Sequence, residues 1–295
     1  MTLRVMVSRH SAFYSPLIST IAAGFLRDHG LEATYSVLGP GQRSQSLIRD
    51  GVVDVMQSAV SSNWKPLERA EAPLPVHFAQ INQRDGFFLA ARADASFQWT
   101  DLEGNSLLAD HGLQPMVMLR YAASRNGADW SRVRVIDAGT PEEMAAAFRA
   151  GAGDYVHLQG PAAQQLEHDR TGYIVASVGR AMPPVAFSSL CASRQFLQTQ
   201  AFQAFLRAFA SAKEWVRQAP PEKVAVKMAS FFPEIDIAVL TVAVRRYQAL
   251  GCWDGGIEIP HDLYEQAVTV FEWAGEIARR HAYGEVCASP PSASA

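Results

Sequence analysis

Short apolar runs alternate with segments of helical periodicity through the first two thirds of the chain. Strands that alternate with helices are typical of βα units and of a mostly parallel sheet. The pattern therefore predicts a protein of the α/β class. The strands expected in the first part of the chain are 4–8, 33–38, 53–57, 76–80 and 87–91.

The helix expected between the first two strands has a clear apolar face. Leu17, Ile21 and Phe25 recur at helical spacing, and Pro16 suits a first turn because its missing N–H is not needed there. The pattern stops near Gly30, where we expect this helix to end.

A second set of βα units is expected from about residue 93. Its clearest helix starts at Thr140-Pro141-Glu142-Glu143, which combines an N-cap hydroxyl, a first-turn proline and acidic residues near the positive end of the helix dipole. The strands expected in this set are 106–109, 133–137 and 155–158, and the helices are 116–126 and 141–150.

The two sets share a short motif. Arg49-x-Gly51-x-x-Asp54 recurs as Arg149-x-Gly151-x-x-Asp154, each time at an expected junction between a helix and a strand. The repeat is interpreted either as a chance similarity of such junctions or as a sign of two related lobes. Together with the alternation of elements, it favours two similar α/β lobes.

The C-terminal third is expected to be mainly helical. Helical periodicity extends over 202–216, 222–231, 235–250 and 262–280. This part is expected to return to the first lobe, with a hinge at crossovers near 84–98 and 180–190. The expected organisation is a first lobe at 1–92, a second lobe at 93–185, a helical return to the first lobe at 186–287 and a disordered tail at 288–295.

The composition excludes several classes of partner. Of the 295 residues, 48% are hydrophobic and 19% charged, and the net charge is -3. Basic residues are scattered among acidic ones, without the basic stripe that a nucleic-acid-binding surface requires. No segment has the roughly 18–20 continuous apolar residues of a membrane-spanning helix. We therefore expect neither nucleic-acid partners nor membrane insertion.

The N-terminus and the cysteines bear on the compartment. Residues 1–10 lack the apolar stretch of a secretory signal, so the protein is expected to be cytoplasmic as written, and periplasmic if a signal was omitted. Cys191, Cys252 and Cys287 are odd in number and widely spaced, which is typical of reduced thiols. Neither a metal nor any other cofactor is expected.

An ordered series of short motifs runs along the chain: Phe13-Tyr14-Ser15-Pro16, Phe25-Leu26-Arg27-Asp28-His29-Gly30-Leu31-Glu32, Gly51-Val52-Val53-Asp54, Thr100-Asp101-Leu102-Glu103-Gly104, Gly151-Ala152-Gly153-Asp154 and Trp253-Asp254. In this order they resemble the substrate-binding proteins of aliphatic sulfonate, nitrate and thiamine-precursor transporters, and the related fungal enzyme that makes the thiamine pyrimidine. The resemblance implies a two-lobed periplasmic-binding-protein type II fold, in which each lobe is a mainly parallel sheet flanked by helices.

The resemblance also implies a function. A small organic ligand is expected in the cleft between the lobes. An ABC-transporter permease is the implied partner if the protein is exported, whereas an intracellular relative would sense or carry a metabolite without a membrane partner.

Candidate ligand-binding residues follow the strands, because ligands of such folds lie at the carboxyl ends of strands, near helix N-termini. Neutral donors, histidines and aromatic residues, without a dense arginine cluster, suit a sulfonate, a carboxylate or a pyrimidine-like molecule. The candidates are His10, Ser11, Phe13, Tyr14, Ser58, Ala59, Ser61, Ser62, Asn63, Trp64, Asp110, His111, Gln114, His157, Gln159 and Gly160.

Several candidates also have a purely structural interpretation. Phe13 and Tyr14 suit a hydrophobic staple at a helix entry as well as a ligand wall. Residues 61–63 suit the cap of a helix that begins near residue 64. His10 and His157 are interpreted either as hydrogen-bonded structural residues or as part of the site.

An enzyme on the same fold is the alternative. The thiamine-pyrimidine synthase uses pyridoxal phosphate held by a lysine, and alignment on Gly51-x-x-Asp54 places Ser58 at that lysine and Ser62 at a nearby histidine. Serine cannot form the required imine. A desulfinase needs a cysteine in the first-lobe loops, which contain none. Cys191 is interpreted as a buried residue and Asp85 as a salt-bridge partner, so binding ranks above catalysis.

Overall fold

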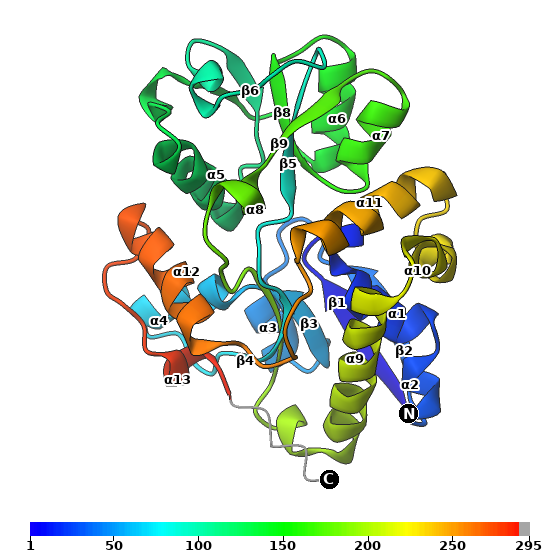
Figure 1. Ribbon diagram of the computed structural model, residues 1–295. Coiled ribbons are helices and arrows are strands. Elements are labelled where there is room, and N and C mark those ends of the chain that lie inside the picture. Colours follow the sequence, from blue (N-terminus) through cyan, green and yellow to red (C-terminus); the bar gives the residue numbers. More distant parts are fainter. Residues whose placement is uncertain (289–295) are drawn as a thin grey trace.

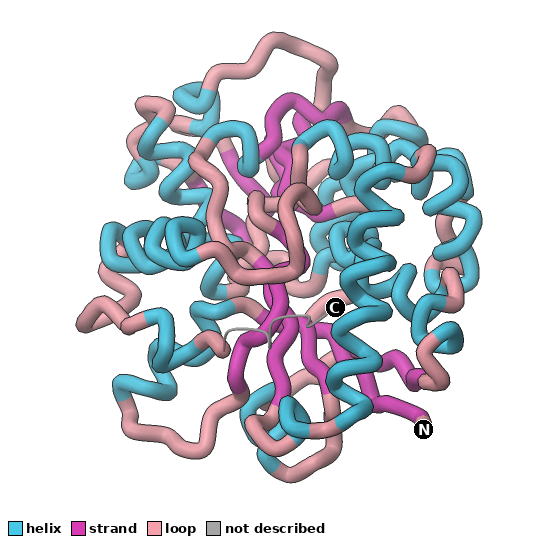
Figure 2. The backbone as a smooth tube through the Cα atoms, turned by 60° about the horizontal axis from the view of Figure 1, so that its bottom comes forward, coloured by secondary structure: helices cyan, strands magenta, loops and turns pink. Residues whose placement is uncertain are grey.

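The chain forms two lobes, each built around a five-stranded sheet (Figure 1). The computed structural model describes residues 1–288, so the predicted tail lies outside the described residues beyond residue 288. We call residues 1–82 and 188–288 the first lobe and residues 87–181 the second lobe. The chain crosses between them at 83–86 and 182–187. Figure 2 shows helices on both sides of the strands.

The first lobe is assembled from two separate parts of the chain. Its sheet has the order β2-β1-β3-β10-β4, in which β10 is antiparallel to both of its neighbours. Its first part contains β1 (Thr2–Val7), α1 (Ser15–Ala22), α2 (Phe25–Asp28), β2 (Glu32–Val37), α3 (Ser44–Arg49), β3 (Val55–Ser58), α4 (Trp64–Glu68) and β4 (Val76–Asn82). Its second part contains β10 (Ser188–Ala192), α9 (Gln200–Gln218), α10 (Pro221–Met228), α11 (Ile237–Leu250), α12 (His261–Trp273) and α13 (Tyr283–Val286).

The second lobe repeats this arrangement in one continuous stretch. Its sheet has the order β7-β6-β8-β5-β9, and β5 is antiparallel to both of its neighbours. Its elements are β5 (Phe87–Ala91), β6 (Ser106–Leu108), α5 (Leu113–Arg125), β7 (Arg134–Ile136), α6 (Pro141–Arg149), β8 (Tyr155–Gln159), α7 (Ala162–His168), β9 (Tyr173–Ser177) and α8 (Val178–Ala181). The α/β class and the two lobes expected from the sequence are confirmed. Each sheet is mixed, however, with two parallel and two antiparallel pairings, and is not mainly parallel as predicted.

One strand that was expected in the first lobe belongs to the second lobe. The sequence placed 87–91 at the end of the first lobe, but β5 pairs with β8 and β9 in the second sheet. The run is apolar throughout and buried on both faces, so its residues do not indicate which sheet it joins. The first crossover therefore precedes β5, at 83–86.

Two expected helices are shorter because glycines interrupt them. The helix predicted to run to Gly30 is divided into α1 and α2 by Gly24, whose φ of +95° lies in the left-handed region. The helix predicted over 262–280 ends at Trp273, and Gly275 follows with a φ of +70°. The strand β10 was not expected, since Ser188–Ala192 shows no alternation of polar and apolar residues.

The repeated motif marks the same junction in both lobes. Asp54 accepts a hydrogen bond from the Arg4 backbone nitrogen on β1 at 2.7 Å, and Asp154 accepts one from the Ser106 backbone nitrogen on β6 at 2.7 Å. Each aspartate nitrogen donates back to the carbonyl of the same partner, at 3.0 Å and 2.9 Å. The two aspartates thus tie corresponding strands together, which explains why the motif recurs.

The C-terminal helices pack mainly against the first lobe. α9 packs against α1 and α2, and the Phe78 ring of β4 lies edge-on to Phe202 and Phe205 of α9. α12 reaches the second lobe, where its Trp273 ring lies edge-on to Tyr121 of α5. Among the helices of residues 1–288, none is long and apolar enough to cross a membrane.

Candidate functional site

A cavity of about 210 Å³ lies between the lobes, at the carboxyl ends of β1, β3 and β8. Serine and glutamine side chains predominate in its lining, and we call it the polar cavity. α5 contributes its first turn, whose free N–H groups favour a ligand atom with negative charge. The lining residues are Ser8, Arg9, Tyr14, Gln57, Ser58, Ala59, Ser61, Ser62, Phe87, Leu113, Gln114, Pro115, Gln159, Phe187 and Ser188.

An ion pair joins the lobes at this cavity. Arg9 follows β1 and donates through Nη1 to Asp110, which follows β6 and also accepts from the Gly112 backbone nitrogen at 2.8 Å. Burial alone raises the pKa of Asp110, but the charge and hydrogen bond of Arg9 hold that pKa below its ordinary value. Both side chains are therefore charged at neutral pH. Among the described residues that line the polar cavity, Arg9 is the charged one.

A chain of hydrogen bonds also crosses the cavity wall. Ser61 Oγ in the 3-10 helix Val60–Asn63 donates to Gln114 Oε1 of α5 at 2.6 Å. Gln114 Nε2 in turn donates to the carbonyl oxygen of Phe187 at 2.7 Å. Gln57 accepts from the Ser8 backbone nitrogen at 3.0 Å, which leaves its Nε2 to bond the Ser58 carbonyl at 3.2 Å. These contacts fix the polar walls before any ligand binds.

Two polar atoms of the cavity lack a partner. Gln159 Oε1 and Ser62 Oγ are buried and form no hydrogen bond within residues 1–288. Gln159 stands at the end of β8 in the second lobe, and Ser62 stands after β3 in the first lobe. Buried polar atoms in folded proteins are nearly always hydrogen-bonded, so each of these atoms calls for a partner that residues 1–288 do not supply.

A second cavity of about 410 Å³ adjoins the first and shares Arg9 and Gln159 with it. Most of its lining surface is apolar, with contributions from prolines, alanines and phenylalanines, and we call it the apolar cavity. The lining residues are Arg9, His10, Ser11, Pro141, Glu142, Ala145, Arg149, Gln159, Gly160, Pro161, Ala162, Gln165, Phe231, Phe232, Pro233, Glu234 and Ile235.

The sequence candidates divide between the two cavities. Tyr14, Ser58, Ala59, Ser61, Ser62, Gln114 and Gln159 line the polar cavity, and His10, Ser11 and Gly160 line the apolar cavity. His10 also has structural partners: one ring nitrogen lies 2.9 Å from the Tyr35 hydroxyl and the other lies 2.8 Å from the Phe231 carbonyl oxygen. Its role is thus to hold the segment 231–235 in place.

His157 lies behind the cavity wall. Its ring stacks on Phe87 with a centroid separation of 4.2 Å, while the Arg9 guanidinium lies 5.5 Å from the Phe87 ring centroid. Burial lowers the pKa of His157 to about 3, so the ring is neutral. His157 supports Phe87 and lines neither cavity.

Five other candidates also line neither cavity: Phe13, Asn63, Trp64, His111 and Asp110, the partner of Arg9. Phe13 is fully buried in the core, where its ring lies 5.1 Å from that of Tyr247. Asn63 donates to the Pro75 carbonyl at 2.7 Å, and the half-exposed His111 lies 2.8 Å from the Ala109 carbonyl. Phe13 and Asn63 thus make structural contacts, but the predicted cap is wrong for Asn63, whose side chain forms no capping hydrogen bond with α4.

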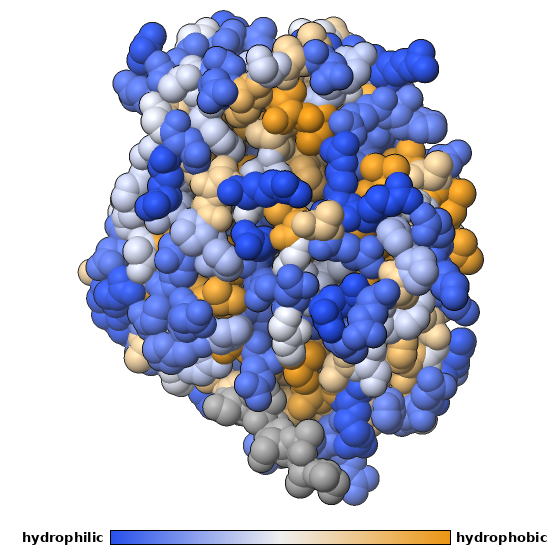
Figure 3. Space-filling view, viewed as in Figure 1, coloured by the Kyte–Doolittle hydropathy of each residue, from blue (hydrophilic) through white to orange (hydrophobic). Residues whose placement is uncertain are grey.

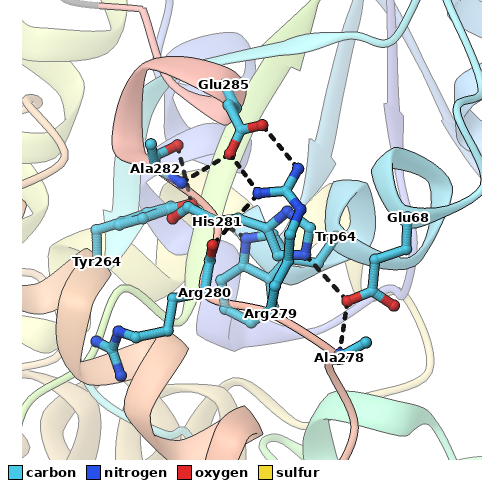
Figure 4. Close-up of polar contacts among 9 residues, drawn as sticks. All are labelled: Trp64, Glu68, Tyr264, Ala278, Arg279, Arg280, His281, Ala282 and Glu285. Carbon is cyan, nitrogen blue, oxygen red and sulfur yellow. Dashed lines mark hydrogen bonds and ion pairs between the residues drawn. The ribbon is translucent and has the colours of Figure 1, made fainter.

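Trp64 holds the C-terminal segment onto α4 (Figure 4). Its Nε1 donates to the Tyr264 hydroxyl at 3.2 Å, and that hydroxyl donates to the His281 carbonyl at 3.0 Å. His281 Nε2 lies 3.2 Å from Glu68, which also accepts from the Ala278 backbone nitrogen at 2.7 Å. The apolar ring and its N–H are therefore occupied within the first lobe.

Several side chains that line the polar cavity, including its charged residue and two aromatic residues, were not predicted from the sequence. His10 was selected because it follows the first strand. Arg9, its neighbour, follows the same strand and could have been selected for the same reason. Phe87 and Phe187 stand in apolar runs beside the crossovers, which the sequence assigns to the core. Eight residues of the polar cavity were missed: Ser8, Arg9, Gln57, Phe87, Leu113, Pro115, Phe187 and Ser188.

Asp85 lies in the first crossover and does not form the expected salt bridge. It is fully buried, its Oδ1 accepts from the Phe87 backbone nitrogen at 2.6 Å, and its Oδ2 has no partner within residues 1–288. Burial, together with the nearby negative charge of Asp110, raises the pKa of its carboxyl to about 8. Asp85 therefore carries a proton at neutral pH, which explains how a carboxyl group is accommodated there.

The stability of the protein is expected to depend on pH through Asp85. Above the ordinary aspartate pKa of about 3.9 and below about 8, the folded state keeps a proton that the unfolded chain releases. The free energy of unfolding therefore falls as pH rises, by about 1 kcal/mol per pH unit. We expect Asp85→Asn to gain stability over the wild type from pH 5 to pH 8 in urea unfolding. Exposed Asp94→Asn is the control, and a pH-independent difference for Asp85→Asn would refute the assignment.

The comparisons with known proteins decide the family. A family model described as NMT1/THI5 like matches residues 13–223, which include the whole second lobe and most of the cavity-lining residues. The chain belongs to the NMT1/THI5-like family. The resemblance inferred from the motifs is thereby confirmed. A relative named "Putative binding protein YtlA" from Bacillus subtilis (strain 168) is 26% identical over 283 residues, which are 94% of this chain and 84% of that protein.

Solved structures show the same fold in other binding proteins. The NMT1/THI5-like chain matches a ligand-binding component of an ABC-type import system from Staphylococcus aureus with a TM-score of 0.77 and 13% identity, over 98% of this chain and 97% of that one. It matches the alkanesulfonate-binding protein SsuA from Xanthomonas axonopodis pv. citri, bound to MOPS, with a TM-score of 0.71 and 13% identity over 98% of both chains. The predicted type II fold is confirmed, and at these identities the likeness concerns the fold alone.

Proposed function

We propose that this NMT1/THI5-like protein binds a small organic molecule in the polar cavity between its lobes. One observation carries the proposal: both lobes line the cavity, and each contributes a buried polar atom without a partner among the described residues, Gln159 Oε1 and Ser62 Oγ. A ligand that forms hydrogen bonds with both atoms contacts the second lobe and the first lobe at the same time. Binding is therefore expected to favour the arrangement in which the lobes are in contact.

The biological role that fits this binding is delivery of the ligand to a transporter. The relatives and fold neighbours named as binding proteins and import components support it. The partner we propose is an ABC-transporter permease, which would place the protein outside the cytoplasmic membrane; a role in sensing a metabolite inside the cell is the second possibility. Co-purification with a membrane permease distinguishes the two.

The ligand class we propose is a sulfonate, a carboxylate or a pyrimidine-like molecule. Hydroxyl and amide groups predominate in the cavity, and the first turn of α5 and the free N–H groups of Arg9 favour an oxygen or nitrogen acceptor. The rings of Tyr14, Phe87 and Phe187 provide apolar contact.

A thermal-shift screen with and without a cavity variant tests the proposal. A ligand that binds only the folded state raises the midpoint of unfolding, so we expect a rise of several degrees with a compound from one of the three classes. Gln159→Leu is expected to weaken that compound's binding about tenfold or more, because it removes a buried amide that offers an anionic ligand a donor and a ligand with an N–H group an acceptor. Gln203→Leu on α9, outside both cavities, is the matched control. If no compound raises the midpoint, or if Gln159→Leu responds like the wild type, the proposed site is wrong.

Ligand binding is expected to change the fluorescence of Trp273. This side chain is 46% exposed on α12, and its ring centroid lies 5.2 Å from Tyr121 of the second lobe, so a relative movement of the lobes changes its surroundings. Trp64, buried within the first lobe, is expected to contribute little. We therefore expect Trp273→Phe to lose most of the ligand-induced change and Trp215→Phe to retain it. A full response from Trp273→Phe would show that the lobes do not move at this contact.

A further inference from the structure

We propose that the ligand is amphipathic, with its polar group in the polar cavity and an aliphatic or aromatic extension in the apolar cavity. This inference rests on the proposed function and adds the shape of the ligand to it. The cavities measure about 210 and 410 Å³. Together they reach the usual size of small-molecule pockets, roughly 300–1,000 Å³, whereas the polar cavity alone falls below it.

Two residues stand at the boundary between the cavities. Arg9 of the first lobe and Gln159 of the second lobe line both cavities. Gln159 is only 6% exposed, and its Oε1 has no partner within residues 1–288. A polar group bonded there stands at the boundary, so any extension of the same molecule has the apolar cavity open beside it.

The walls of the apolar cavity are held in place by hydrogen bonds. His10 fixes the Phe231 carbonyl at 2.8 Å and stacks on Phe232 with a centroid separation of 4.3 Å. On the opposite wall the Gly160 carbonyl accepts from the Ala12 backbone nitrogen at 3.1 Å and from Ser11 Oγ at 2.7 Å. The cavity is therefore formed in advance, which lowers the entropy cost of binding a tail.

The surface of this cavity is mainly apolar, which suits an apolar tail. Charged Glu142, Arg149 and Glu234 are exposed, whereas Ala145 and Phe232 are buried. The other apolar lining residues are Pro141, Pro161, Ala162, Phe231, Pro233 and Ile235. On the visible face of the molecule, hydrophobic residues gather near the start of α11 and over α10 (Figure 3), where Ile237 and Val226 are exposed.

Burial of a tail predicts a dependence of affinity on chain length. Each methylene group removed from water improves affinity roughly three- to fourfold. The probes are two homologous series, n-alkanesulfonates and n-alkanamides of two to eight carbons. Their head groups both offer acceptors to Arg9, and the amide also offers a donor to Gln159 Oε1. Each compound competes with the fluorescent amphiphile 8-anilinonaphthalene-1-sulfonate.

Two substitutions on α6 separate the apolar cavity from the rest of the protein. Ala145→Phe fills the cavity, whereas Ala146→Phe adds the same ring at an exposed position one residue away. We expect affinity to rise with chain length in the wild type and in Ala146→Phe, and to be independent of it in Ala145→Phe. Ala162→Phe, at a partly exposed position in the same cavity, replaces Ala145→Phe if that variant does not fold.

The outcomes distinguish this inference from the proposed function. If short compounds raise the thermal midpoint but chain length has no effect in the wild type, the ligand site stands and the amphipathic ligand is wrong. If chain length matters equally in Ala145→Phe and Ala146→Phe, the tail lies elsewhere and the inference fails. Failure of both series to displace the fluorescent probe would also overturn it. Failure of every compound in the thermal screen, in contrast, contradicts the proposed function itself.

Discussion

Replacing Gly179 with alanine is expected to lower the free energy of unfolding by about 3 kcal/mol. A β-carbon at Gly179 in α8 would lie 2.2 Å from the carbonyl oxygen of Asp85, a backbone atom that no side-chain rotation moves aside. The helix and the first crossover must therefore separate, and the hydrogen bond of 3.1 Å from Arg84 Nη1 to the Gly179 carbonyl is lost with them. Urea unfolding followed by far-UV circular dichroism measures the loss.

Gly284→Ala is the matched control for this substitution. Gly284 lies in the helix α13, where a new β-carbon meets no atom within 4 Å. Alanine there is expected to leave stability unchanged or to raise it by up to about 1 kcal/mol, because it restricts the unfolded chain. A Gly179→Ala protein that unfolds at the wild-type urea concentration would contradict the close packing of α8 on the crossover.

Tyr247→Phe is expected to destabilise the protein by about 2–4 kcal/mol. The hydroxyl of Tyr247, fully buried on α11, accepts from the Gly160 backbone nitrogen at 2.6 Å and donates to the Gly86 carbonyl at 3.0 Å. Phenylalanine fills the same space but leaves an N–H group and a carbonyl buried without partners. Since Gly160 belongs to the second lobe and Gly86 to the crossover, the variant also loosens the contact between the lobes.

A second tyrosine provides the comparison for Tyr247→Phe. Tyr173 of β9 is half-buried, and its hydroxyl forms no hydrogen bond with residues 1–288, so Tyr173→Phe is expected to change stability by less than about 0.5 kcal/mol. Thermal and urea unfolding of both variants give the difference. Equal stability of the two variants would mean that the Tyr247 hydroxyl does not hold the lobes together.

The alternation of strands and helices was enough to predict the α/β class, because hydrophobic periodicity reflects burial directly. The type II fold was predicted from the family resemblance. The glycine and aspartate of the repeated motif also act as expected at a junction between helix and strand. Elements without such a signal were missed or misplaced. β10 has no alternation, and β5 is apolar on both faces, so only the pairing of distant strands assigns each of them to its sheet.

The site was predicted in part for a related reason. The rule that ligands lie at the carboxyl ends of strands found Ser58, Ser62 and Gln159, since this position depends on strand order alone. The rule does not predict which way a side chain in a loop points. His157 and Trp64 lie near strand ends but point into their own lobes, whereas Phe187 reaches the cavity from a crossover.

The placement of β10 bears on the order in which the protein folds. In the first sheet β4 pairs with β10 and with no other strand of the described chain, so β4 has no partner until the chain has passed through the second lobe and returned. The second lobe is continuous in sequence, so its sheet can form as soon as that stretch has been synthesised. We therefore expect the second lobe to fold as a unit first, with the first lobe, although synthesised earlier, closing its sheet last.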